Sequence, residues 1–112
     1  CPGLADLIED GNTEGEKLEK YILELLMPYL KEDIDYIVLG CTHYPFARKT
    51  IQKVAGDKVR IIDGSLGTAK QLRRRLKAAG LENPKTDRGI IVFEDSIPAK
   101  TELCRQMFEK DI

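Results

Sequence analysis

The chain has 112 residues, of which 42% are hydrophobic and 33% charged, and its net charge is −1 at pH 7. This length suits one ordinary domain with a modest core. The near-zero charge argues against general binding to nucleic acid or to a membrane surface, and no apolar run is long enough to span a bilayer.

The first part of the chain predicts two helices. A short helix is expected over residues 2–10, where a proline suits the first turn. Thr13 and Glu16 have the spacing of a capping box and predict the start of a longer helix. Pro28 lies within the apolar pattern of that helix, and we expect it to kink or end the helix near Met27.

Three strand–helix units are expected to follow. Their strands are short apolar runs rich in β-branched residues, at residues 36–39, 59–62 and 90–93. The first run is too continuous for a half-exposed strand. The helices after the strands are expected over residues 45–55, 65–79 and 95–111. The side chains expected on the buried faces of the last two helices are Leu66, Ala69, Leu72, Leu76 and Ala79, and then Ile97, Cys104, Met107 and Phe108.

This alternation predicts an α/β fold with a parallel sheet. We expect a small parallel sheet of about three strands flanked by helices, which amounts to an incomplete doubly wound (flavodoxin-like) domain. The three arginines at residues 73–75 would point in different directions around a helix. We interpret them as a solvated helix surface and not as a nucleic-acid site.

Three cysteines, Cys1, Cys41 and Cys104, lie far apart without a CxxC pair. Since the sequence also opens without a signal-peptide pattern, we expect free thiols in a reducing, cytoplasmic setting. No metal site is expected, because the chain has one histidine and no clustered thiols. The absence of an initiator methionine fits a processed chain or a fragment.

The candidate site is the run Cys41-Thr42-His43, which follows the first predicted strand. The carboxyl edge of a parallel sheet is where active sites gather. The helix expected from Pro45 would favour the thiolate of Cys41, and residues two apart on an extended backbone face the same side. A structural interpretation stays open, because free cysteines and single histidines are often buried structural residues.

Four segments carry a resemblance to glutamate racemases. LGCTHYPF at residues 39–46 resembles the signature around the family's second catalytic cysteine, and related aspartate racemases usually carry glutamate in place of His43. CPGLADLIEDG, RIIDGSLGTAKQL and IIVFEDSIPAK resemble other family segments in the same order. The family's first cysteine, in an Asn-Thr segment, and its amino-terminal Asp-Ser-Gly segment have no counterpart. The resemblance therefore covers the carboxyl-terminal half only.

The resemblance implies a two-domain α/β enzyme that uses no cofactor and interconverts L- and D-glutamate, supplying D-glutamate for peptidoglycan. In the family, two cysteines face opposite sides of the substrate Cα. Carried over, Cys41 is one of these acid/base residues and His43 assists its proton transfer. Thr42 and His43 would hold the amino acid, and Glu9 would orient the imidazole. The loop at Gly64 and Ser65 departs from the family's commoner Ser-Gly order.

The resemblance also implies an arrangement of domains and partners. Residues 1–88 would form part of the carboxyl-terminal α/β domain, and residues 89–112 would pack on a missing amino-terminal domain. The partners that the resemblance implies are glutamate and the missing amino-terminal half. A homodimer is expected for a different reason, because truncation would leave apolar surface exposed, and the charge and short apolar runs predict no nucleic-acid or membrane partner. The 112-residue chain alone is expected to be inactive.

Two alternatives remain open. The first is a non-catalytic α/β domain that keeps the thiol pocket to bind a ligand or partner. The second is a Cys-His hydrolase, although a nucleophile and base two residues apart rarely form the in-line hydrogen bond that acyl transfer needs.

Overall fold

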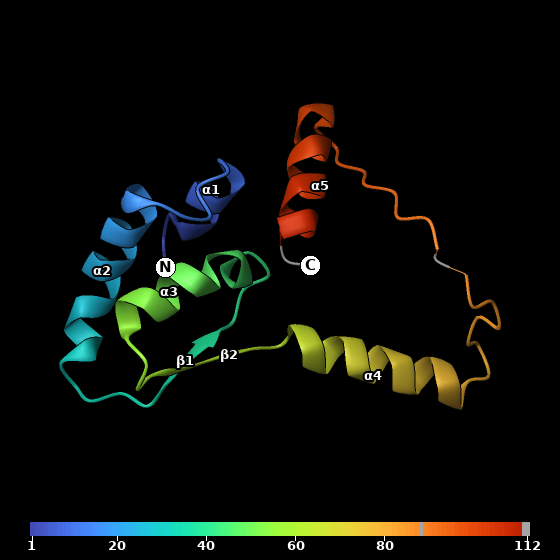
Figure 1. Ribbon diagram of the computed structural model, residues 1–112, viewed down its shortest axis with the longest axis horizontal. Helices are drawn as coiled ribbons and strands as arrows, with labels where there is room; N and C mark the ends of the chain where they lie inside the picture. Colours follow the sequence, from blue (N-terminus) through green and yellow to red (C-terminus); the bar gives the residue numbers. More distant parts are fainter. Residues whose placement is uncertain (88, 111–112) are drawn as a thin grey trace.

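The computed structural model describes residues 1–87 and 89–110 and has a mixed α/β architecture (Figure 1). Its α-helices are α1 (Leu4–Glu9), α2 (Glu16–Leu30), α3 (Arg48–Ala55), α4 (Ser65–Ala78) and α5 (Thr101–Lys110). Its strands are β1 (Tyr36–Leu39) and β2 (Arg60–Asp63), and its 3₁₀ turns are η1 (Tyr44–Ala47) and η2 (Pro98–Lys100). None of the helices in the described ranges is long and apolar enough to cross a membrane.

The two strands form a small parallel sheet. Tyr36 pairs with Arg60, and the register continues to the pair of Leu39 with Asp63. Helix α3 makes the crossover between the strands. Because parallel strands end at the same edge, the segments after Leu39 and after Asp63 leave the sheet side by side. The predicted parallel sheet flanked by helices is confirmed.

The predicted third strand at residues 90–93 is wrong. These residues are irregular, and Ile90, Ile91 and Val92 are 92%, 59% and 71% exposed. A β-branched run forms a strand only where a neighbouring strand supplies ladder hydrogen bonds. Helix α4 carries the chain away from the sheet, so the run lies in a long connection that meets no strand in the described part of the chain (Figure 1).

The core lies between helices α1, α2 and α3 and one face of the sheet. It consists of Leu4, Ile8, Leu18, Ile22, Leu39, Ala47, Ile51 and Ile61. The other face of the sheet is open, because Val38 and Ile62 are 69% and 46% exposed. The expectation that the first strand is buried throughout is therefore wrong. Alternate side chains of a strand face opposite ways, and the described residues cover one face only.

The expected buried face of helix α4 is also absent, since no residue of this helix is buried. Leu66 and Leu72 are 65% and 59% exposed. The amphipathic pattern of a helix shows that one face suits burial but does not supply the surface that buries it. For the last predicted helix the expectation holds in part, because Met107 packs against the core and Cys104 is half-buried, while Phe108 is exposed. Ile97 is exposed and lies outside α5, before the turn η2. Residue 111, the end of that predicted helix, lies outside the described residues.

Two details of helix α2 differ from the sequence expectation. The helix begins at Glu16 after Gly15, without a side-chain cap, and Thr13 is buried instead of capping. The backbone carbonyl of Thr13 accepts a hydrogen bond from the Thr50 hydroxyl at 3.4 Å. The helix does not end near Met27 as one of the two expected outcomes had it; it contains Pro28 in its last turn and ends at Leu30. The carbonyl that loses its partner belongs to the exposed Glu24, where water can replace the missing hydrogen bond.

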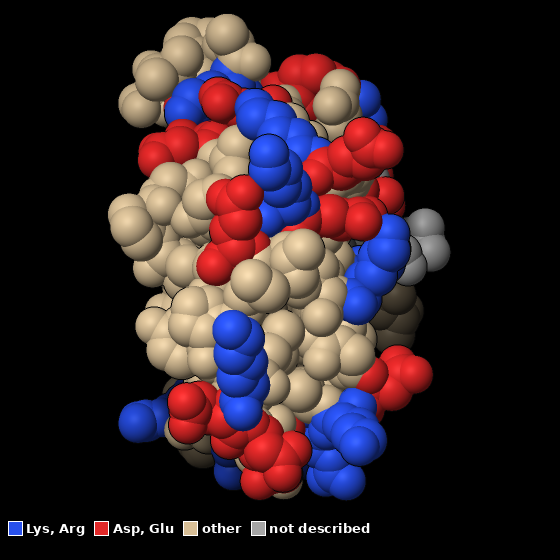
Figure 2. Space-filling model, turned by 90° about the vertical axis from the view of Figure 1, so that its left-hand side faces the viewer, with Lys and Arg blue, Asp and Glu red and all other residues tan. Residues whose placement is uncertain are grey.

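The face of the molecule formed by helices α1, α2 and α3 carries both positively and negatively charged side chains. In Figure 2, basic and acidic side chains are interspersed, and an uncharged area lies between two charged zones. This mixture agrees with the net charge of −1. The face shows no field of a single sign that would steer a polyanion.

Leu18→Ala should destabilise the fold far more than Leu23→Ala. Both residues lie on α2, so helix propensity changes equally, but Leu18 is 0% and Leu23 47% exposed. We expect Leu18→Ala to lower the free energy of unfolding by about 2–5 kcal/mol because it leaves a cavity. Leu23→Ala should cost less than about 1 kcal/mol. Urea unfolding followed by circular dichroism measures both, and equal losses would contradict the assigned core.

Candidate active site

The run Cys41-Thr42-His43 connects β1 to η1 at the carboxyl edge of the sheet. The backbone N–H of Tyr44 donates to the carbonyl of Cys41 at 3.3 Å, and that of Phe46 donates to the carbonyl of His43 at 3.1 Å. These two bonds form a tight turn directly after the strand. Pro45 opens a 3₁₀ turn and not an α-helix, so the N-terminus of α3 is farther along the chain than the sequence indicates.

The thiol of Cys41 faces the imidazole of His43. The distance from Sγ to Nδ1 is 3.8 Å, and both side chains are half-buried. Hydrogen bonding from the backbone of His43 lowers the pKa of the Cys41 thiol, the imidazole adds to this effect when it is protonated, and partial burial opposes it. The largest cause of this shift is hydrogen bonding within the turn, and helix α3, which was expected to favour the thiolate, begins only at Arg48.

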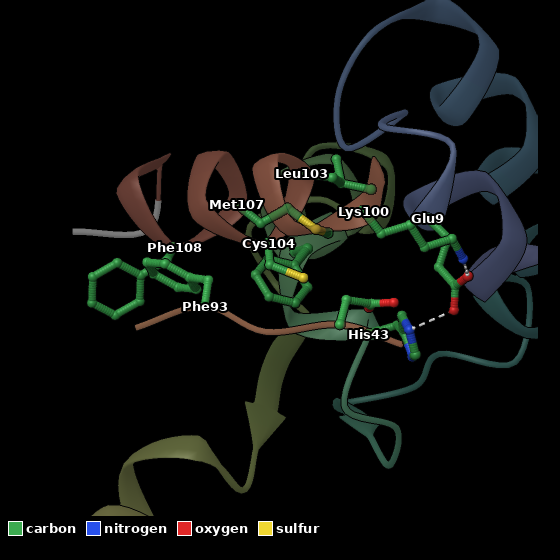
Figure 3. A pocket seen from close by; sticks show the side chains of 10 residues that line it. Glu9, His43, Phe93, Lys100, Leu103, Cys104, Met107 and Phe108 are labelled. Atoms are coloured by element: carbon green, nitrogen blue, oxygen red, sulfur yellow. Dashed lines mark hydrogen bonds and ion pairs between the residues drawn. The ribbon is translucent and has the colours of Figure 1, made fainter. Parts of the chain in front are cut away.

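The imidazole is held from its other side by a carboxylate. His43 Nε2 lies 3.1 Å from Oε1 of Glu9, the last residue of α1 (Figure 3). Glu9 in turn pairs through Oε2 with Nζ of Lys100 at 2.6 Å, and this ammonium, more than His43, lowers the pKa of Glu9. An ionised carboxylate only accepts hydrogen bonds, so Nε2 carries the proton. In the neutral ring Nδ1 is then an acceptor that faces the thiol.

Thr42 and His43 line two different hollows. Exposed Thr42 lies with Cys41 in a hollow of about 710 Å³ between the end of β1 and the start of α4. His43 lines another hollow, of about 480 Å³, with Glu9 and Lys100. The structure therefore brings Cys41, His43 and Glu9 into one chain of contacts. Of these three residues, only Cys41 lines the same hollow as Thr42.

The hollow beside His43 is polar at one end and apolar at the other (Figure 3). Its polar side chains are those of Glu9, His43, Asp95 and Lys100. Its apolar wall consists of Phe46, Phe93, Leu103, Cys104, Met107 and Phe108. The rings of Phe93 and Phe108 have centroids 5.5 Å apart, which attaches the irregular segment before η2 to helix α5. The α5 thiol thus lines a hollow that the sequence pattern did not reveal.

The loop after β2 is fixed by an acidic side chain. Asp63 accepts a hydrogen bond from the backbone N–H of Ser65 at 2.9 Å and pairs with Arg48. Arg48 also donates to the carbonyl of Ile61 at 2.7 Å. The Ser65 hydrogen bond, more than Arg48, lowers the pKa of Asp63. The Gly64-Ser65 order therefore still gives a loop that is tied to the sheet beside the candidate site.

Residues 1–87 and 89–110 contain no group of three or more His, Cys, Asp or Glu side chains placed to hold a metal ion. The chemistry that this edge offers comes from a thiol with a lowered pKa, an imidazole and a carboxylate. Such a set can take up and return a proton.

Cys41 should be the most reactive of the three thiols near neutral pH. Its lowered pKa leaves more thiolate present as the pH falls, and the thiolate is the reacting species. Cys104 is also half-buried and serves as the internal comparison. Alkylation with iodoacetamide over a pH series, read by peptide mass spectrometry, should show Cys41 reacting first. His43→Ala should remove only the smaller part of this advantage, because it keeps the backbone hydrogen bonding that is the largest cause of the lowered pKa. Preferential labelling of Cys104 would contradict this.

No family model matches the chain. Individual proteins do match it, and they are glutamate racemases. The relative from Clostridium perfringens strain ATCC 13124 is 43% identical over 111 residues, which cover 97% of this chain and 43% of the relative. The relative from Clostridium acetobutylicum is 48% identical over 97 residues, covering 87% of this chain and 38% of the relative.

Solved structures agree. A glutamate racemase isoform from Bacillus anthracis superposes with a TM-score of 0.67 at 34% identity, covering 78% of this chain and 33% of that protein. The glutamate racemase from Francisella tularensis, solved in complex with D-glutamate, superposes with a TM-score of 0.71 at 28% identity. The match covers 93% of this chain and 40% of that protein. The resemblance inferred from the motifs is confirmed. The chain spans less than half the length of these relatives.

Proposed function

We propose that this chain supplies the carboxyl-terminal half of a cofactor-independent glutamate racemase, an isomerase that interconverts L- and D-glutamate. The observation that carries the proposal is the contact chain from Cys41 through His43 to Glu9, at the carboxyl edge of a parallel sheet. The similarity to glutamate racemases, one of them bound to D-glutamate, supports glutamate as the substrate.

In this proposal Cys41 transfers the proton at one face of Cα. Its thiolate takes the Cα proton as the thiol forms, and the second cysteine, from the amino-terminal half, delivers a proton to the opposite face. In the reverse direction Cys41 is the donor. The Cα–H bond is a weak acid, so the base must be poorly hydrated and the developing carbanion must meet fixed donors. A thiolate is less strongly hydrated than a carboxylate and suits this task.

His43 assists that transfer. With Nε2–H donating to Glu9, its Nδ1 can accept the thiol proton and so regenerate the thiolate. Thr42 contributes a hydroxyl to the hollow that contains the thiol, where we place the amino acid. His43 lines the neighbouring hollow and not this one, so in this proposal its part is the proton transfer more than the holding of the amino acid. Glu9 acts by holding the imidazole and does not touch the substrate.

The open apolar surface is the place where the amino-terminal half would pack. Val38 and Ile62 on the sheet, Leu72 on α4 and Ile90 on the irregular segment are all exposed. The relatives are more than twice as long as the matched region, so they contain chain that could cover this surface. Without that half, we propose that the chain forms a homodimer. The assembled enzyme would act in the cytoplasm and supply D-glutamate to peptidoglycan synthesis.

The proposal is tested with a fusion of this chain to the unmatched amino-terminal part of the Clostridium perfringens relative. Circular dichroism of L-glutamate and, separately, of D-glutamate follows racemisation. We expect the fusion to bring both to the same racemic end point. A folded fusion that leaves both enantiomers unchanged would contradict the function.

A further inference from the structure

We propose that Lys100 is a positioning residue of this site, which holds the Glu9 carboxylate so that His43 presents Nδ1 to Cys41. Sequence reasoning gives no sign of this role, because Lys100 and Glu9 are 91 positions apart. Its consequence for catalysis rests on the proposed function. The contact chain itself does not depend on that function.

The geometry forms a series of four side chains. Lys100 Nζ lies 2.6 Å from Oε2 of Glu9, and Oε1 of the same carboxylate lies 3.1 Å from Nε2 of His43. Nδ1 of that ring lies 3.8 Å from Sγ of Cys41. Each carboxylate oxygen thus serves one partner. An ammonium on one oxygen keeps the carboxylate from turning, so the other oxygen stays directed at the imidazole.

The pair contributes little to stability. The side chains of Lys100 and Glu9 are 38% and 42% exposed, and ion pairs that exposed are worth little in water. The position of Lys100 is more informative. It ends the 3₁₀ turn η2 directly before α5, while Glu9 ends α1, so the contact joins the last helix to the site.

The charge of Lys100 also matters. Apart from His43, the charged groups near this pair are Asp10 and Asp95, which together with Glu9 favour the protonated lysine. The ammonium offsets the negative charge of Glu9. Without it, the carboxylate would stabilise the protonated imidazole more strongly. A protonated ring has no acceptor at Nδ1, so Lys100 favours the ring form that can take the thiol proton.

The test uses the 112-residue chain, in which His43 is the single histidine, so its ring signals in a proton–carbon NMR titration need no assignment. Lys100→Met removes the charge at similar length and should move the midpoint of the imidazole titration to higher pH by roughly 0.5 unit or more. Lys100→Arg should keep the midpoint near that of the unchanged chain. Lys53→Met is the matched control, because Lys53 pairs with Glu19 at 2.6 Å in another surface ion pair.

A double-mutant cycle separates positioning from a direct effect. In a Glu9→Gln background, Lys100→Met should produce no further shift, because the carboxylate that links the two groups is gone. The inference is overturned if Lys100→Met leaves the midpoint unchanged, or if it shifts the midpoint equally in the Glu9→Gln background. Lys100→Gln repeats the measurement if the methionine variant does not fold.

The outcome is independent of racemase activity, because no substrate is present. If the midpoint shifts as expected but the fusion is inactive, the proposed function fails and the positioning role of Lys100 stands. If both hold, Lys100→Met in the fusion should lower turnover and shift its pH profile, with Lys100→Arg restoring both.

Discussion

Cys41→Ser should lower the turnover of the fusion enzyme by roughly 10²- to 10⁴-fold, the range typical of losing a general acid or base. A serine hydroxyl is not ionised near neutral pH, whereas the backbone and side chain of His43 lower the pKa of the Cys41 thiol. Serine is close to cysteine in size, so the fold and the substrate pocket should survive. Initial rates with L-glutamate, measured by circular dichroism, give the ratio.

Cys104→Ser is the matched control for that experiment. Cys104 is half-buried like Cys41 and lines the hollow next to the site, but it is not one of the three side chains in the proposed proton transfer. Its substitution should leave turnover close to that of the unchanged fusion. The assignment of Cys41 would be wrong if Cys104→Ser abolished turnover while Cys41→Ser kept it.

The second large effect concerns the open apolar surface. We expect the isolated chain to sediment as a dimer at high concentration, because exposed contiguous apolar surface favours association. The sheet face contributes Val38 and Ile62, which are 69% and 46% exposed, and α4 contributes Leu72 beside them. Leu72→Glu places a charge in this surface and should shift the chain to a monomer.

Leu81→Glu provides the comparison, since Leu81 is 68% exposed but lies beyond the end of α4. This variant should remain a dimer in sedimentation velocity experiments at the same concentrations. A monomeric unchanged chain, or equal dissociation in both variants, would contradict the proposed role of the sheet face.

The parts of the fold that sequence could predict depend on local patterns. The apolar run at β1, the proline in η1 and Gly56 after α3 act on their own neighbourhoods, and each appears close to its expected place. The errors concern features that need a distant partner. The run at residues 90–93 meets no neighbouring strand, and α4 has a suitable apolar face that no described element covers.

The candidate site also contains residues that the sequence could predict and one that it could not. Cys41 and His43 are two residues apart, so this spacing at the end of a strand was enough to suggest that their side chains lie on the same side. Glu9 was suggested by the family resemblance and not by spacing, and the structure places it against the imidazole. Lys100 had no signal at all, because nothing in a local pattern specifies which exposed lysine will reach which carboxylate.

The central claim is that this chain contains one of the two cysteines that transfer protons at Cα. The most direct test of this claim is the behaviour of the isolated 112-residue chain with glutamate. Racemisation needs a proton acceptor and a proton donor on opposite faces of Cα, and the account places only Cys41 in this chain. Circular dichroism of L-glutamate incubated with the pure chain should therefore stay constant, and racemisation should begin when the amino-terminal part of the Clostridium perfringens relative is added in trans. Racemisation by the chain alone, abolished by Cys41→Ser, would contradict the account, because a second proton-transfer residue would then lie within these residues.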